Sequence, residues 1–365
     1  MTKTEKRFLL VNPYGVGDVL FTTPLLRALR DHFPGCVLGY LCNRRTREIL
    51  ETHPLVHRLF VYEKDELRKM WRMSKWEALR ALFSLCSDIR KEHYDVLLDF
   101  SLAPEFSFVL KWLGIPRRIG LDYRNRGRFL TDRIFLAGFD DRPVAEYYLD
   151  TLRRLGQSPV AGNYRTELWT TEEDERFADS FFLDHSFSRN VIGILPGGGA
   201  AFGAQKGSYR RWGATQFATL CDKVWENFRM ECLVFATPGE EGITETLVHQ
   251  VKGKVTVAHQ TTLRQMASLM KRCRAVICND SGPLHVAVAA GAKTVSLFGP
   301  VDPRVYGPYT RQTTHHAIVT QSVVCSPCYR RFKLPECAQN VCLQWISPEK
   351  VLEALQGVLE KASEE

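Results

Sequence analysis

The chain has 365 residues, of which 45% are hydrophobic and 25% charged, and its formal net charge is +8. This length suffices for two domains that each bury a core, and the composition is that of a globular protein in water. The sequence has no stretch of 18 apolar residues, so no membrane-spanning helix is predicted. No signal peptide is recognised before the first strand either, and we therefore expect a cytoplasmic protein. The positive charge favours an anionic partner, which is a nucleotide, a phosphorylated substrate, a membrane surface or nucleic acid.

In the first half of the chain, short apolar runs alternate with helical patterns. The first run, residues 7–12, precedes a helical pattern over residues 19–32 that has apolar side chains on one side. Further strands are predicted at residues 37–41, 59–62 and 95–100. Strands that alternate with helices indicate a parallel sheet covered on both faces.

The second half repeats this alternation. Its predicted strands cover residues 190–195, 231–236, 254–257, 274–278 and 293–298. Its predicted helices cover residues 212–227, 240–251, 263–272, 283–290 and 348–361. The expected fold class is therefore α/β, with two doubly wound domains.

A polar segment with Gly and Pro, residues 156–171, separates the two halves. We therefore expect a Rossmann-like domain over residues 1–160, a second over residues 172–346, and a C-terminal helix, residues 347–365, that packs back on the first domain. Such sheets bind ligands at the carboxyl ends of their strands, so the loops that follow the strands are where a site is expected.

The loop after the first strand carries Gly15, Gly17 and Asp18. The glycines permit a tight turn and a close approach of the backbone to a ligand. The loop is neither a dinucleotide fingerprint, because Leu20 stands where a third glycine is needed, nor a P-loop, because no Gly-Lys-Ser/Thr follows. Asp18 is either a helix cap or a carboxylate that faces the ligand.

A glycine-rich loop follows the first strand of the second half. Gly197 and Gly198 expose backbone N–H groups, and Lys206, Arg210 and Arg211 place cations near them. This combination suits a pyrophosphate, whereas the commoner interpretation of such a loop is an ordinary basic surface.

A strand–turn–helix pattern surrounds Asp280. Pro283 fits the first turn of a helix, so that the free N–H groups near Ser281 and Gly282 can bind a diphosphate. Asp280 is either a ribose ligand or a loop cap, and His285 is either a phosphate donor or a buried helix residue.

Three segments together resemble glycosyltransferase family 9, the lipopolysaccharide heptosyltransferases. They are NPYGVGDVLFTTPLLRALRDHFPG, LPGGG followed by RRWGATQFATL, and NDSGPLHVAVAAGAKTVSLFGPVDP. The resemblance implies a GT-B fold, in which two Rossmann-like doubly wound domains face each other across a cleft. It also implies an ADP-heptose donor on the C-terminal domain, a lipopolysaccharide core or other phosphorylated glycolipid acceptor on the N-terminal domain, and an inverting transfer that requires no cofactor and no metal.

The same resemblance assigns roles to individual residues. Asp18 is similar to the family's general base, and either Lys206 or Arg211 to its phosphate-binding cation. Glu241 resembles a ribose-binding acid. The full set of expected donor contacts is Gly197, Gly198, Lys206, Arg211, Glu241, Asp280, Ser281, Gly282 and His285.

Basic residues gather at two further places in the first half. Residues 64–80 hold six basic and three acidic residues with Trp71, Met73 and Trp76 among them. This pattern is commonly an amphipathic helix with its aromatic side chains in the core, and otherwise a surface that rests on the anionic inner membrane. The second group is a predicted turn whose arginines suit phosphate, and no nucleic-acid-binding module is visible. The expected acceptor contacts are Gly17, Arg118, Arg124 and Arg126.

Four cysteines, Cys325, Cys328, Cys337 and Cys342, lie within 18 residues. Their spacing is compatible with a structural zinc site that fixes the segment before the last helix, and equally with unliganded or redox-sensitive thiols.

Three rival functions remain open at this stage. One is a transferase for another nucleotide sugar, and a second is a nucleotide-sugar epimerase on the same fold. The third is a nucleotide-sugar sensor or scaffold without catalysis, against which the presence of Asp18 argues.

Overall fold

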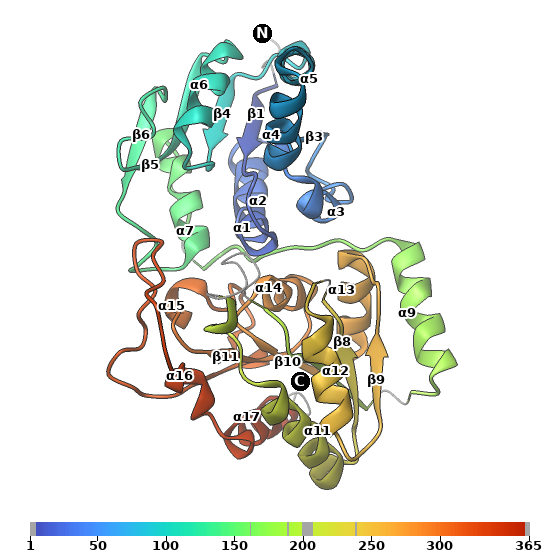
Figure 1. Ribbon diagram of the computed structural model, residues 1–365. Coiled ribbons are helices and arrows are strands. Elements are labelled where there is room, and N and C mark those ends of the chain that lie inside the picture. Colours follow the sequence, from blue (N-terminus) through green and yellow to red (C-terminus); the bar gives the residue numbers. More distant parts are fainter. Residues whose placement is uncertain (1–4, 161, 188–189, 199–206, 238, 362–365) are drawn as a thin grey trace. The chain divides into compact units, whose positions relative to one another are not determined.

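The computed structural model describes residues 5–160, 162–187, 190–198, 207–237 and 239–361 (Figure 1). The chain divides into two compact units. The first comprises Met1–Gly138 with Val144–Tyr164, and the second comprises Phe139–Pro143 with Arg165–Glu365. We describe each unit by itself.

The described residues of the first unit form a six-stranded parallel sheet in the order β3-β2-β1-β4-β5-β6. This is the Rossmann order, with its switch point between the central strands β1 and β4. Both central strands are almost fully buried, because each carries an unbroken apolar run. The strands are β1 (Arg7–Val11), β2 (Val37–Cys42), β3 (Arg58–Val61), β4 (Val96–Asp99), β5 (Arg117–Tyr123) and β6 (Asp132–Leu136).

Helices connect these strands except for β5 and β6, which are joined by turns. Two of the helices pack against each other as a hairpin, α4 (Lys64–Met73) with α5 (Lys75–Lys91). The single helix predicted over residues 64–80 is therefore two helices. The break falls at Ser74, whose side chain caps α5 by accepting from the Glu77 N–H at 3.3 Å. The others are α1 (Val16–Leu20), α2 (Thr23–His32), α3 (Arg47–Leu50), α6 (Pro104–Trp112), α7 (Val144–Leu149) and α8 (Thr151–Arg154), with the 3-10 turn η1 (Arg44–Thr46).

The second unit repeats this topology. Its strand order is β12-β11-β10-β7-β8-β9, again parallel, so that its switch point lies between β7 and β10. The strands are β7 (Val191–Leu195), β8 (Glu231–Phe235), β9 (Val255–Ala258), β10 (Ala275–Asn279), β11 (Thr294–Phe298) and β12 (His316–Thr320). The helices are α9 (Glu172–Asp184), α11 (Ala214–Phe228), α12 (Glu241–Gln250), α13 (Leu263–Arg272), α14 (Gly282–Ala289), α15 (Pro303–Tyr306), α16 (Val341–Gln344) and α17 (Pro348–Lys361), with the 3-10 turn η3 (Thr313–His315).

The last helix packs within the second unit, where α17 contacts α11 and β12. Its apolar stripe explains this position, because Val351, Leu355 and Val358 are buried in the same core cluster as Phe217 of α11.

No helix in the described ranges is both long and apolar enough to cross a membrane.

Candidate functional site

Asn279 holds together the two loops at the switch point of the second unit. Its side-chain N–H donates to the carbonyl of Pro196 at 2.8 Å and that of Gly197 at 3.1 Å, and its oxygen accepts from the Trp212 N–H at 2.9 Å. The loop after β7 is thereby fixed beside the end of β10, where a doubly wound sheet binds its ligand.

Asp280 follows Asn279 and forms an ion pair with Arg210 in a nearly dry environment. Asp280 is only 2% exposed, and the side chain of Arg210 is 12% exposed. Burial raises the pKa of the Asp280 carboxyl, and the Arg210 guanidinium opposes this shift. Oxygen Oδ1 of Asp280 has no hydrogen-bond partner among the described residues. A buried oxygen that lacks a partner in this way can accept a hydrogen bond from a hydroxyl group of a ligand.

Ser281 is the N-cap residue of α14, but its hydroxyl donates to the carbonyl of Asn279 at 3.2 Å and does not cap the helix. The first N–H groups of α14, beginning at Gly282, thus receive no side-chain cap from Ser281. Such groups, with the positive end of the helix dipole, bind anions.

His285 lies one turn into α14 and is 5% exposed. Burial, and secondly the Arg210 charge, lower the pKa of its imidazole to about 3. The ring is therefore neutral at physiological pH, so that any contact it makes with a phosphate is a hydrogen bond from a neutral donor.

Glu240 closes the other side of the glycine loop. It is 6% exposed, and its carboxylate accepts from the Gly198 N–H at 3.0 and 3.1 Å and from Arg211 Nη2 at 2.7 Å. Arg211 Nε in turn donates to the Gly198 carbonyl at 2.6 Å. Both glycines are required here: a Cβ on Gly197 would lie 2.2 Å from Glu240 Oε2, and Gly198 has a φ of +139°.

Two residues of this region, Glu240 and Arg210, lie outside the set of expected donor contacts. Glu240, and not Glu241, lies against the glycine loop, since Glu241 is exposed and accepts from the Gly239 N–H at 2.9 Å. Arg210, expected only as one of the cations near the glycine loop, forms an ion pair with Asp280. Arg211 does contact the predicted loop, and Lys206 lies outside the described residues.

In the first unit, Asp18 lies on α1 directly after the switch-point loop that follows β1. Its Oδ2 accepts from the Gly15 N–H at 3.1 Å, and its carbonyl accepts from Asn12 Nδ2 at 3.1 Å. Tyr14 donates its hydroxyl to the carbonyl of Ser101, which follows β4. The half-buried Asp18 side chain is thereby held in a defined turn at the carboxyl end of the central strand β1.

Two buried phenols, those of Tyr40 and Tyr148, lie close enough to Asp18 to be affected by its charge. Burial, and secondly the negative charge of Asp18, raise the pKa of Tyr148, and burial with smaller contributions from neighbours including Asp18 raises that of Tyr40. Both tyrosines are therefore neutral at physiological pH.

The predicted acceptor residues occupy different environments. Arg118 lies in β5, and its guanidinium donates to the carbonyls of Phe129 at 2.9 Å and Ile115 at 2.6 Å, so it fixes the chain locally. Arg124 and Arg126 are exposed, with both guanidinium groups over the Tyr123 ring. Gly17 lies within α1, next to Asp18.

The four clustered cysteines line one small cavity of about 30 Å³ in the second unit. They are free thiols, and burial raises the pKa of Cys342 to about 11. In the part of the chain that the structure describes, no three or more His, Cys, Asp or Glu side chains are arranged to hold a metal ion. The zinc site stays a prediction.

Two doubly wound sheets, each with an ordered polar loop at its switch point, define a two-domain α/β protein of the GT-B fold. The model of glycosyltransferase family 9 (heptosyltransferase) matches residues 82–338, and the chain belongs to this family. It is thus a glycosyltransferase.

Relatives that match nearly the whole chain include a lipopolysaccharide heptosyltransferase, and solved structures share its fold. Lipopolysaccharide heptosyltransferase 2 of Escherichia coli (strain K12) is 24% identical over 371 residues, which cover 97% of this chain and 98% of the relative. The crystal structure of a family 9 glycosyl transferase from Veillonella parvula has a TM-score of 0.81 at 23% identity, with 99% of each chain covered. The E. coli heptosyltransferase WaaC with ADP has a TM-score of 0.71 at 17% identity, covering 96% of this chain and 99% of that one.

Glu240→Gln is expected to weaken nucleotide-sugar binding about tenfold or more, because it removes a charged acceptor shared by Gly198 and Arg211 and leaves Arg211 without its buried partner. Glu241→Gln, the matched control on the adjacent exposed residue, is expected to bind like wild type. Calorimetric titration of both variants with the nucleotide sugar measures this difference. Equal affinities of the two variants would contradict the placement of Glu240 in the site.

Proposed function

We propose that this glycosyltransferase moves a heptose from ADP-heptose to the inner core of lipopolysaccharide, with inversion and without a metal ion. The Asp280–Arg210 pair at the start of α14, together with the Glu240–Gly198 network, is the observation that supports a nucleotide-diphosphate donor most directly. The relative from E. coli carries the name lipopolysaccharide heptosyltransferase, and a solved neighbour holds ADP.

In this mechanism, each described group has a task. The Asp18 carboxylate takes the proton from an acceptor hydroxyl while that oxygen bonds to the anomeric carbon. The bond from this carbon to the diphosphate breaks, and ADP leaves with the electron pair. The N–H groups at the start of α14 stabilise the charge that develops on the diphosphate, and the neutral His285 donates a further hydrogen bond.

The nucleoside end of the donor is assigned to two buried carboxylates. Glu240 and Asp280 both lie at the switch point, and the unsatisfied Oδ1 of Asp280 accepts a hydroxyl or N–H of the nucleoside. The acceptor is a phosphorylated glycolipid, for which the exposed Arg124 and Arg126 are suitable cations. The reaction then takes place at the inner face of the cytoplasmic membrane.

Acceptor dependence tests this proposal against its rivals. With ADP-heptose and delipidated core acceptor, we expect ADP release only when both are present. An epimerase converts the nucleotide sugar without acceptor, and a sensor binds it without turnover. Nucleotide-sugar conversion without acceptor, or binding of ADP-heptose with no release of ADP on any core acceptor, would overturn the proposal.

A further inference from the structure

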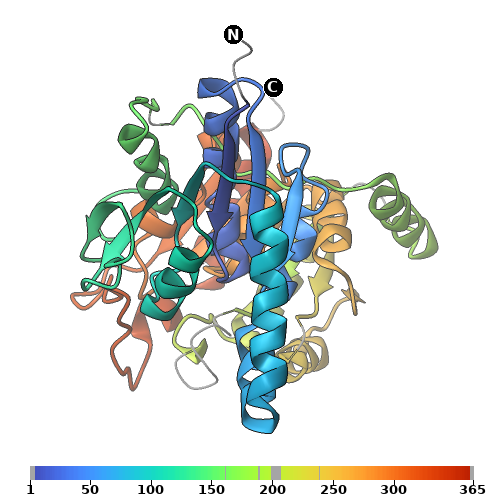
Figure 2. The ribbon, with the colours of Figure 1, turned by 90° about the horizontal axis from the view of Figure 1, so that it is seen from above.

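The α4–α5 hairpin ends in large apolar side chains that face solvent. The exposed fractions are 47% for Trp71, 76% for Met73 and 78% for Trp76, which flank the break at Ser74. The interpretation that these aromatic residues belong to the core is therefore wrong. Figure 2 shows the far end of this hairpin extending away from the first sheet. An exposed apolar cluster of this kind marks an interaction surface.

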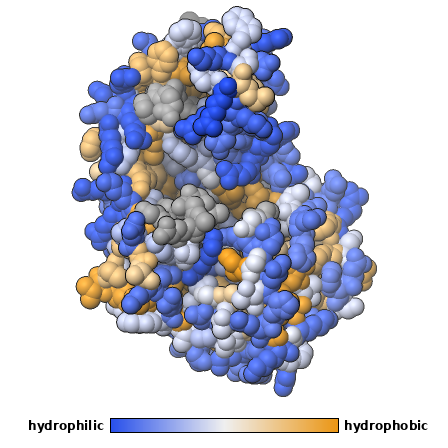
Figure 3. Space-filling model, viewed as in Figure 1, coloured by the Kyte–Doolittle hydropathy of each residue, from blue (hydrophilic) through white to orange (hydrophobic). Residues whose placement is uncertain are grey.

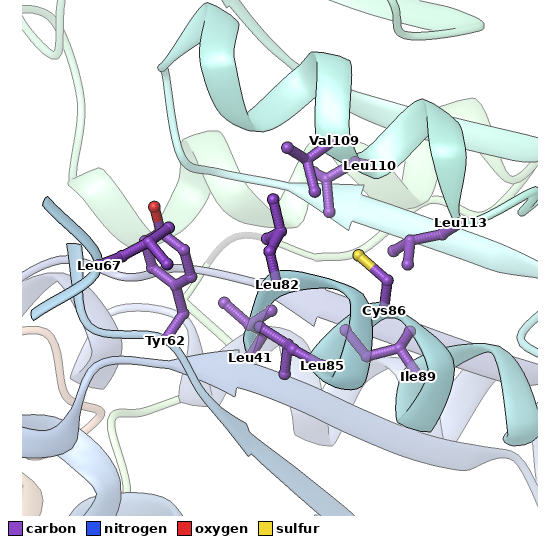
Figure 4. A pocket seen from close by; sticks show the side chains of 10 residues that line it. All are labelled: Leu41, Tyr62, Leu67, Leu82, Leu85, Cys86, Ile89, Val109, Leu110 and Leu113. Carbon is purple, nitrogen blue, oxygen red and sulfur yellow. The ribbon is translucent and has the colours of Figure 1, made fainter. Parts of the chain in front are cut away.

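The inner face of the same hairpin is already used for packing within the first unit. Leu67 of α4 and Leu82, Leu85 and Cys86 of α5 line an apolar cavity of about 200 Å³, opposite Leu110 of α6 (Figure 4). These side chains point towards the sheet and α6, so that they hold the hairpin to the domain. The residues at the tip are not needed for that packing.

Basic residues surround the apolar tip. Between residues 68 and 80, Arg68, Lys69, Arg72, Lys75 and Arg80 are exposed, against Glu77 as the one acid in this segment. Hydrophilic side chains dominate the surface over α4 and α5, with paler and orange ones among them (Figure 3). Tryptophan flanked by Lys and Arg favours the interface between water and an anionic lipid bilayer, because the rings enter the headgroup layer while the cations meet the lipid charges.

We propose that the tip of the α4–α5 hairpin is a membrane-docking element that inserts Trp71, Met73 and Trp76 among the headgroups of an anionic bilayer. This inference rests on the proposed function, because an enzyme that acts on a lipid-anchored acceptor must reach the membrane surface. It adds to that function a named surface, whose residues include neither Asp18 nor any residue assigned to the donor site. A protein partner would need acidic groups to match this tip, whereas an anionic bilayer supplies charge and an apolar layer together.

The test is sedimentation of the full chain with vesicles of phosphatidylethanolamine, with and without phosphatidylglycerol. Wild type is expected to bind the anionic vesicles and to be released by high salt. Trp71→Ser with Trp76→Ser is expected to lower the partition coefficient at least about tenfold. Replacement of Lys69, Arg72 and Lys75 by Gln is expected to abolish the preference for phosphatidylglycerol.

Trp345→Ser is the matched control, because Trp345 is also exposed, at 63%, but lies in the second unit. It should bind vesicles like wild type. Each variant is also assayed for transfer to the water-soluble delipidated acceptor, where the hairpin variants are expected to match wild type, so that a failure of docking and a failure of the transferase function give different results. Wild type that stays in the supernatant, hairpin variants that sediment like wild type, or variants that change only the oligomeric state would overturn the docking proposal.

Discussion

Asp18→Asn is expected to lower the rate of acceptor-dependent ADP release by about 10² to 10⁴, the range that a positioned general base contributes. An asparagine retains an oxygen that accepts from the Gly15 N–H, so that the turn after β1 keeps its hydrogen bond while the base is lost. The variant is therefore expected to fold and to bind ADP-heptose with wild-type affinity. Steady-state assays with delipidated core acceptor, combined with donor titrations, separate the two effects.

A control for the charge change is Asp88→Asn, since Asp88 is another carboxylate of the first unit and forms an exposed ion pair with Lys91 at 2.8 Å. This control should keep full activity, because exposed ion pairs contribute little to stability. An Asp18→Asn enzyme that transfers heptose at the wild-type rate would exclude Asp18 as the base.

The central strands were predictable because burial on both faces leaves an unbroken apolar signal. β1 and β7, with the sequences RFLLV and VIGIL, match the predicted strands closely. The sequence analysis missed β5, β6 and β12, because none of them has the continuous apolar run of a central strand. β5 begins with two arginines. β6 and β12 are edge strands with partly exposed residues.

The helix predicted over residues 19–32 shows how local hydrogen bonds decide a boundary. The structure divides it into α1 and α2, with Phe21 and Thr22 between them. The hydroxyl of Thr22 donates to the Val19 carbonyl and that of Thr23 to the Leu20 carbonyl, both at 2.7 Å. Such side-chain bonds compete with the helical ladder, and the apolar pattern does not record them.

The candidate site was predictable as a set of loops but not to the residue. The positions after β1, β7 and β10 follow from topology, because parallel strands present their carboxyl ends on one edge. The choice between neighbouring residues does not follow from spacing: Glu240 is buried while Glu241 is exposed, and Arg210 reaches Asp280 while Arg211 reaches Glu240. In each pair, tertiary packing decides which partner, if any, each side chain meets in these loops.

Arg210→Met is expected to lower the free energy of unfolding by about 3 to 5 kcal/mol, because it leaves the Asp280 carboxylate buried without its cation. Asp280→Asn in the same chain should restore much of this loss, since the double variant has no buried charge at this pair. Urea unfolding of the single and double variants measures the coupling. If the single and the double variant lose the same free energy of unfolding, the buried charge of Asp280 is not the cause of the loss.

The loss of unfolding free energy in Arg210→Met should also depend on pH in a defined direction. Burial already raises the pKa of Asp280 while Arg210 lowers it, so removal of Arg210 raises this pKa further. A carboxyl whose pKa is higher in the folded state than in the unfolded chain, where it is about 3.9, binds more protons when folded, and stability falls as pH rises through that window. The deficit is therefore largest near neutral pH and shrinks on acidification, as Asp280 becomes protonated. In the proposed donor site Asp280 accepts a hydrogen bond from the nucleotide sugar. Acid that rescues the fold of this variant is therefore not expected to rescue its affinity for the nucleotide sugar, which separates the stabilising role of the pair from its proposed role in binding.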